Sequence, residues 1–70
     1  MHLEGIPVEL AQKPNWRDTD TAKFLDVSPS MVRQLVMRRE IPHIKIGKSL
    51  RFDPIEVRAW LDTKRVRQKK

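Results

Sequence analysis

Residues 19–38 read TDTAKFLDVSPSMVRQLVMR and predict two short helices joined by a tight turn. The first helix is expected over about residues 19–25, with Asp18 as its N-cap, because a carboxylate accepts the free amide hydrogens of a first helical turn. The second is expected to follow at once, because Ser28 suits an N-cap and Pro29 suits the first helical position. Two short helices connected in this way form a helix-turn-helix.

The second of these helices, over residues 28–38, has one apolar and one polar side when its residues are placed at about 100° intervals. The apolar side, expected in the core, carries Val32, Leu35 and Val36. The opposite side carries Ser30, Arg33, Gln34 and Met37. Arginine binds guanine and glutamine binds adenine through paired hydrogen bonds, so this side is suited to reading base edges. A plain amphipathic surface helix exposes the same side chains, and the helix by itself leaves both interpretations open.

After Pro42 the spacing of apolar residues changes from a helical repeat to an alternation, which predicts a β-hairpin. Ile44 and Ile46 alternate with Lys45, and a connection containing glycine leads into a second alternation around Leu50. The residues of this hairpin that are suited to phosphate or minor-groove contact are Lys45, Gly47, Lys48, Ser49 and Arg51. The alternative is an exposed strand edge that its charges protect from aggregation.

A third helix is predicted at the strongest start signal of the chain, Asp53-Pro54-Ile55-Glu56, where an aspartate cap precedes proline. Trp60 on this helix and Trp16 before the first helix are expected in the core rather than as platforms for stacked bases. A basic tail follows, with the cations Lys64, Arg65, Arg67, Lys69 and Lys70. Three interpretations of the tail stay open: it contacts the DNA backbone, it docks onto a protein partner, or it is simply solvated.

The length and charge of the chain limit the number of domains and the kind of partner that it can have. With 70 residues it has room for one domain, and its 15 Lys and Arg against 9 Asp and Glu give a formal charge of +6. Such a positive field on a small domain favours a nucleic-acid partner over a merely solvated surface. We expect an N-terminal arm over residues 1–15, a DNA-binding domain over residues 16–63 and the basic tail over residues 64–70. The short apolar alternation from Ile6 to Leu10 suggests an extended piece of the arm that packs on the domain.

Other classes of function have little support. Cysteine is absent and His2 lies far from His43, so no metal site is expected. The only glycines are Gly5 and Gly47, too few for a loop that cradles phosphates, and we expect neither an enzyme nor a cofactor. No apolar run approaches the roughly 20 residues of a membrane span, and the first residues do not resemble an export signal. We therefore expect a cytoplasmic protein without membrane contact.

Three segments together resemble the excisionase-like winged helix-turn-helix domains, which are related to the MerR-type DNA-binding domain. They are residues 21–36, 41–52 and 57–61. The most specific motifs are Leu25-x-Val27-Ser28, Ile41-Pro42 followed by Ile46-Gly47-Lys48, and Ala59-Trp60-Leu61. The resemblance covers about residues 16–62 and implies a mainly α fold with a small β-hairpin, the wing.

The resemblance also implies how such a domain acts. The second helix enters the major groove and the wing enters the adjacent minor groove. The recognition-helix residues expected to contact DNA are Ser28, Ser30, Met31, Arg33, Gln34, Met37 and Arg38. Family members from phages and mobile elements are recombination directionality factors. They bind double-stranded DNA at neighbouring sites, associate with one another along it, bend it, and assist an integrase, a tyrosine or serine recombinase, in excision.

We therefore expect an excisionase acting in a bacterial host cell, and the short chain favours this over a ligand-sensing regulator. Two alternatives stay open. A small transcriptional regulator of the MerR-like type would make the same contacts on another target. A protein-interaction module would bind DNA weakly and without sequence preference.

The chain departs from the family pattern at two turns. Aspartate replaces the usual glycine at Asp26, which is tolerable because aspartate adopts the left-handed conformation more readily than most residues. Arginine replaces a common glycine at Arg39, which weakens the expectation of a left-handed cap after the second helix.

Overall fold

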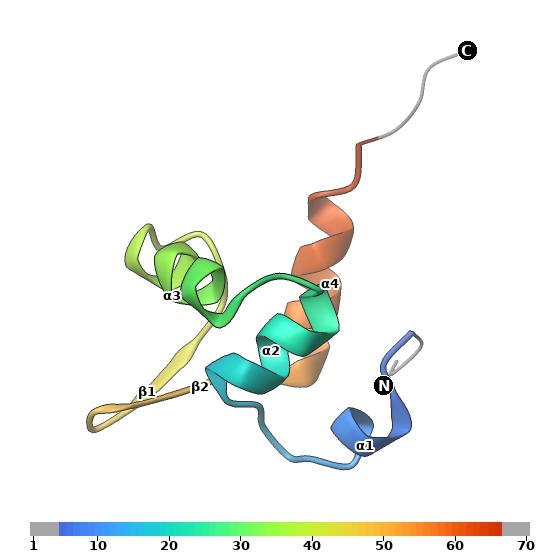
Figure 1. The fold of residues 1–70 in the computed structure, drawn as a ribbon, viewed down its shortest axis with the longest axis horizontal. Helices are drawn as coiled ribbons and strands as arrows, with labels where there is room; N and C mark the ends of the chain where they lie inside the picture. The colour runs from blue at the N-terminus through green and yellow to red at the C-terminus, as the bar shows by residue number, and fades with distance from the viewer. Residues whose placement is uncertain (1–4, 67–70) are drawn as a thin grey trace.

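The computed structural model describes residues 5–66, whose helices and hairpin are drawn in Figure 1. The elements are α1 (Val8–Ala11), α2 (Asp18–Leu25), α3 (Pro29–Met37), β1 (Ile44–Ile46), β2 (Ser49–Arg51) and α4 (Pro54–Thr63). Helices α2 and α3 form the helix-turn-helix, the antiparallel hairpin of β1 and β2 projects on the α3 side, and α4 contacts α2. The predicted fold class, a winged helix-turn-helix that is mainly α with a small β-hairpin, is confirmed.

Local signals begin α3 and α4 as predicted. The Ser28 hydroxyl accepts a hydrogen bond from the Met31 amide at 3.1 Å, and proline occupies the first turn of α3. The Asp53 carboxylate accepts from the amides of Ile55 and Glu56 at 2.8 and 3.4 Å. Each cap satisfies amide hydrogens that have no partner inside the helix.

The start of α2 differs from the prediction by one residue. Arg17, not Asp18, is the N-cap, and the Asp20 carboxylate accepts a hydrogen bond from the Arg17 amide at 3.1 Å. Asp18 is the first helical residue, and its carboxylate accepts from the amide of Thr19 at 2.8 Å. The two carboxylates thus accept from different amides at the start of the helix, and neither aspartate is the N-cap.

The chain turns after α2 and α3 on residues other than glycine. Asp26 (φ 59°) and Arg39 (φ 58°) both adopt the left-handed conformation. After α3 the Arg39 amide donates to the Val36 carbonyl and the Glu40 amide donates to the Leu35 carbonyl, each at 2.9 Å. These paired bonds are those of a Schellman motif. The left-handed cap therefore forms at Arg39 without glycine, contrary to the weakened expectation.

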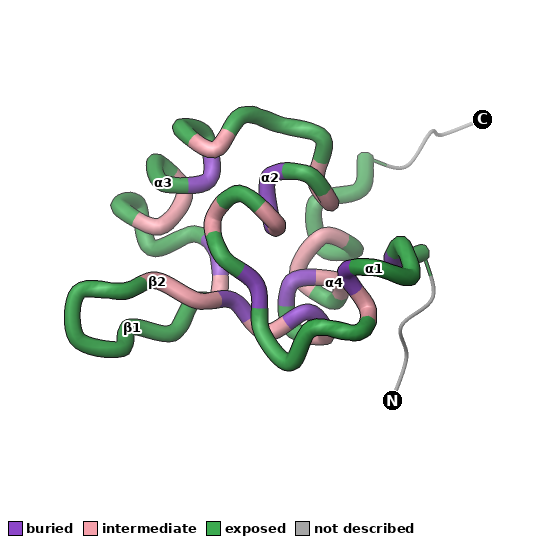
Figure 2. The backbone as a smooth tube through the Cα atoms, turned by 60° about the horizontal axis from the view of Figure 1, so that its bottom comes forward, coloured by how far each residue is buried: buried purple, intermediate pink, exposed green. Residues whose placement is uncertain are grey.

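One apolar cluster forms the core of the described residues, and its members are spread over the helices and the base of the hairpin (Figure 2). Its buried side chains are Ile6, Leu10, Trp16, Ala22, Val32, Ile41, Phe52 and Val57. Trp16 is fully buried and its Nε1 donates to the Leu10 carbonyl at 2.9 Å, so it is a core residue as predicted. The chain around Leu10 forms the helical turn α1 and not the short extended piece that the sequence suggested.

The hairpin is joined to this core at its base and exposed at its tip. Trp16 and Phe52 exchange two backbone hydrogen bonds of 2.8 Å just beyond β2. The register of β1 and β2 leaves Gly47 and Lys48 as a two-residue loop. Gly47 has φ 61°, the positive value that the first central residue of a type II′ turn requires. The glycine thus sets the geometry of the tip.

Candidate nucleic-acid interface

Helix α3 has the two sides predicted for it. Val32 is buried in the core, while Leu35 and Val36 are half-buried against it. The exposed residues include every candidate for DNA contact in this region, namely Ser28, Ser30, Met31, Arg33, Gln34, Met37 and Arg38. Met37 is the most prominent apolar one, with 83% of its surface exposed. The helix therefore offers a continuous accessible side to a partner.

Arg33 on this side is held by a neighbouring helix. Its guanidinium donates to the Asp18 carboxylate at 2.9 Å, and the two side chains are 55% and 28% exposed. A guanidinium has five N–H donors in a rigid planar fork, so one such bond orients the group and leaves it able to donate elsewhere. Asp18, predicted as a cap, instead positions an arginine of the exposed side of α3.

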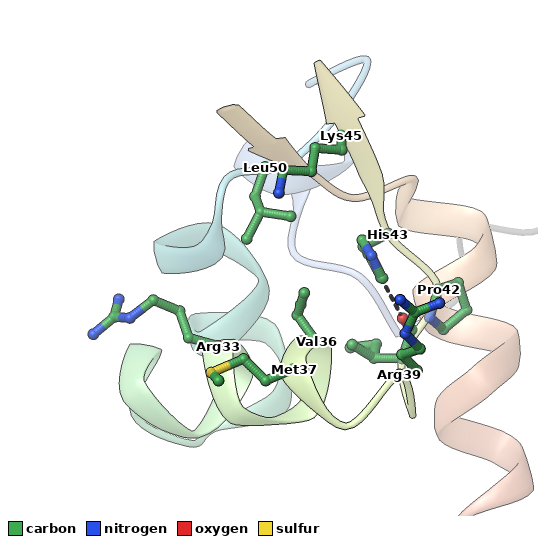
Figure 3. Close-up of a pocket in the computed structure, with 9 residues that line it drawn as sticks. Arg33, Val36, Met37, Arg39, Pro42, His43, Lys45 and Leu50 are labelled. Carbon is green, nitrogen blue, oxygen red and sulfur yellow. Dashed lines mark hydrogen bonds between the residues drawn. The ribbon is translucent and has the colours of Figure 1, made fainter. Parts of the chain in front are cut away.

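An open groove runs between α3 and the hairpin (Figure 3). It is lined by Arg33, Val36, Met37, Arg39, Ile41, Pro42, His43, Lys45 and Leu50. The structure thus brings the exposed side of α3 and the wing residue Lys45 to one surface. His43 lies in this groove with its Nδ1 3.0 Å from the Ile41 carbonyl oxygen (Figure 3).

Arg39 and His43 were not among the candidates from the sequence. Arg39 follows the last turn of α3, so a helical projection of residues 28–38 does not place it on either side. His43 lies in the connection before β1, where the sequence has neither the helical nor the strand repeat of apolar residues. Only the packing of the hairpin beside α3 puts them on one surface. The one signal in the sequence that singled out Arg39 was that arginine replaces a glycine that is common at this position.

The other wing residues lie around a second hollow. It is lined by Arg17, Asp18, Lys48, Ser49, Leu50 and Arg51, and so joins the hairpin to the start of α2. The Arg51 guanidinium donates to the Leu50 carbonyl at 2.8 Å. Around Gly47 a side-chain carbon would meet no atom within 4 Å, so the tip is open on all sides. The wing candidates are therefore divided between two faces of the hairpin.

The described part of the basic tail is attached to α4. The Lys64 ammonium lies 5.5 Å from the centre of the Trp60 ring, and Arg65 Nε donates to the Asp62 carboxylate at 2.9 Å. Hydrogen bonds from Arg58 and Arg65 hold the pKa of Asp62 below its usual value. The end of α4 points away from the hairpin tip (Figures 1 and 2). The remaining tail candidates, Arg67, Lys69 and Lys70, lie outside the described residues.

Within residues 5–66, no three His, Cys, Asp or Glu side chains gather as they would around a metal ion. Among the helices in that range, none has the length and apolar character needed to cross a membrane.

Comparison with known proteins agrees with the geometry. The family model described as a helix-turn-helix domain matches residues 19–65, which is more than half of the chain and includes α2, α3, the hairpin and α4. No curated protein and no solved structure matches the chain significantly. The matched segment contains both helices that a helix-turn-helix uses to bind DNA, together with the hairpin beside them. The chain belongs to the helix-turn-helix family of DNA-binding domains.

Proposed function

We propose that this chain is an excisionase, a recombination directionality factor that binds specific double-stranded DNA sites and shapes them for an integrase. The observation that carries the proposal is the common groove shared by the exposed side of α3 and the cationic hairpin. One partner in contact with both elements must be extended and anionic. Duplex DNA meets both requirements, because its major groove admits a helix while its backbone attracts the surrounding cations.

In this proposal α3 reads base edges in the major groove. Arg33 suits the paired acceptors of guanine and Gln34 suits the donor and acceptor of adenine, and Met37 contacts a thymine methyl. Ser28, Ser30, Met31 and Arg38 lie along the same exposed side and contact bases or the adjoining backbone. The ion pair with Asp18 holds Arg33 ready, so less side-chain freedom is lost on binding.

The hairpin and the tail supply contacts that do not depend on sequence. Lys48 and Ser49 at the tip enter the adjacent minor groove with Gly47, while Lys45 and Arg51 approach the strands on either side of it. The basic tail neutralises further phosphates or docks on a protein partner. Each phosphate contact adds to affinity on every duplex and steepens its dependence on salt.

The mechanism is architectural and involves no covalent chemistry by this chain. Bending a site of 20–30 base pairs by 40–90° costs about 1–6 kcal/mol, which several protomers bound side by side can share. Protomers therefore bind neighbouring sites cooperatively, and the bent array presents the attachment site to the integrase, a tyrosine or serine recombinase.

The test combines a gel-shift titration with a recombination assay. The chain is titrated onto its element's attachment site and onto random duplex at two salt concentrations, and excision by the element's integrase is measured with and without it. Preference for the attachment site together with stimulated excision supports the proposal. Repression of a nearby promoter without any effect on excision identifies a transcriptional regulator instead. Weak binding that is equal on all sequences identifies a protein-interaction module.

A further inference from the structure

We infer that the groove between α3 and the hairpin holds one strand of the DNA backbone, and that Arg39 and His43 are phosphate ligands in it. The inference rests on the proposed function, since it assumes duplex DNA as the partner. It adds a binding site whose two central residues lie outside the recognition helix and the strands of the wing.

The first argument is topological. The major and minor grooves of a duplex are separated on each side by a single sugar-phosphate strand. A protein that puts α3 in one groove and the hairpin in the next must therefore let that strand pass between them. The groove lies at this place, with Arg33 and Met37 of α3 on one wall and Lys45 of β1 on the other (Figure 3).

The second argument is the chemistry of the lining. Arg39 comes from the turn that follows α3 and Lys45 from β1, so cations line the groove from two separate segments, while the guanidinium of Arg33 is paired with Asp18. None of the nine lining residues is acidic. The rest of the lining is mostly apolar, with Val36, Ile41, Pro42 and Leu50 among its members. A cationic rim over an apolar floor suits a phosphodiester, whose phosphate oxygens accept hydrogen bonds while its deoxyribose faces are largely apolar.

The third argument is the backbone at Arg39. With φ 58° it holds a conformation that glycine adopts most easily and that costs other residues free energy. Arginine at this position is exposed and lines the groove, so the position is not explained by packing in the core. A strained position that keeps a charged side chain is more readily explained by binding than by folding.

His43 adds a second polar side chain to the groove. Its Nδ1 lies 3.0 Å from the Ile41 carbonyl oxygen, which only accepts, so the ring donates there and leaves Nε2 for a partner. In the imidazolium form Nε2 donates to a phosphate oxygen. Arg39 and Lys45 line the same groove, so His43 lies among cations that attract the same phosphate.

The test is fluorescence anisotropy with a labelled duplex at several salt concentrations. Arg39→Gly relieves a strained backbone, so weaker binding by this variant does not reflect unfolding. We expect it to weaken binding alike on specific and random duplexes and to reduce the salt slope by about one. His43→Gln, which removes the imidazole ring from the groove, should also weaken binding alike on both duplexes. Lys23→Gln, which removes an exposed α2 cation that lines neither groove, is the matched control.

The outcomes separate this inference from the function it rests on. If the wild-type chain does not bind duplex DNA, the proposed function and the backbone site both fail. If it binds duplex DNA but Arg39→Gly and His43→Gln keep its affinity and salt slope, only the backbone site fails. If both variants change these readouts as expected and Lys23→Gln does not, the site is supported.

Discussion

The Arg33 guanidinium donates a hydrogen bond of 2.9 Å to the Asp18 carboxylate, and this ion pair ties the exposed side of α3 to the first residue of α2. The pair is partly exposed, and such pairs contribute at most about 1 kcal/mol to stability. Its main effect is therefore to orient the guanidinium, and under the proposed function Arg33 then loses less side-chain freedom when it binds a base edge.

The substitution Asp18→Asn should show whether Asp18 acts by orienting Arg33 or only by its negative charge. The substitution removes the ion pair and one negative charge beside the DNA, so affinity for random duplex should rise slightly. Preference for the specific site should fall, by less than the 1–3 kcal/mol that a good paired base contact is worth. Anisotropy on specific and random duplexes measures both effects. Unchanged preference would show that Asp18 does not orient a base-reading arginine.

Arg33→Ala and Gln34→Ala should each lower binding to the specific site by about 1–3 kcal/mol and leave binding to random duplex nearly intact. The reason is that both side chains lie on the exposed side of α3 and contribute little to the core. Gln12→Ala, at an exposed position next to α1, is the control for a lost glutamine. Equal losses on both duplexes would assign these residues to the backbone instead.

Arg39→Gly should raise the free energy of unfolding by about 1 kcal/mol, because the left-handed conformation costs a residue with a side chain about 1–2 kcal/mol. Asp26→Gly should gain less, since aspartate adopts this conformation more easily. Arg38→Gly, one residue earlier and right-handed at φ −82°, should gain nothing. Urea denaturation of the three variants gives the comparison. If Arg39→Gly instead lowers the free energy of unfolding, the arginine side chain stabilises the fold by more than its left-handed backbone destabilises it.

The ionised carboxylate of Asp20 should contribute to the free energy of unfolding near neutral pH and lose this contribution at low pH. Burial raises the pKa of Asp20, but the hydrogen bonds from the Lys13 ammonium and the Arg17 amide hold it below its ordinary value of 3.8. A carboxyl whose pKa is lowered by folding stabilises the protein above its unfolded pKa, and this contribution is lost as pH falls through the folded value. Asp20→Asn should therefore be less stable than the wild-type chain at pH 7, by up to about 1 kcal/mol.

That deficit should disappear as the pH falls through the lowered pKa of Asp20, because the wild-type carboxyl is then protonated as well. Thermal melts from pH 2 to 7 follow it. Glu9→Gln, which changes an exposed acid of α1, is the control and should show no such difference. A constant deficit at all pH values would assign the effect to packing rather than to charge.

The sequence predicted the elements whose signals are local. Ser28-Pro29 and Asp53-Pro54 begin helices wherever they occur, because cap and first position are satisfied within a few residues. Gly47 marked the turn of the hairpin for the same reason. These local signals were enough to place the exposed side of α3 and the wing.

The features that the sequence missed depend on contacts between distant residues. Leu10 is buried within the helical turn α1 and Ile6 is buried just before it, so the apolar alternation of this segment does not correspond to a strand. Trp16, directly before the N-cap of α2, pairs with the distant Phe52. Arg39 and His43 share a groove only because the hairpin packs beside α3.

The hairpin is attached to the core at one end only. Its base is fixed by the Trp16–Phe52 pair in the core, while β1 and the tip are exposed. Under the proposed function, we therefore expect the exposed tip with Lys48 to adjust to minor grooves of different width while the paired base stays in place. We expect discrimination between sites to depend on helix α3, which packs against the core.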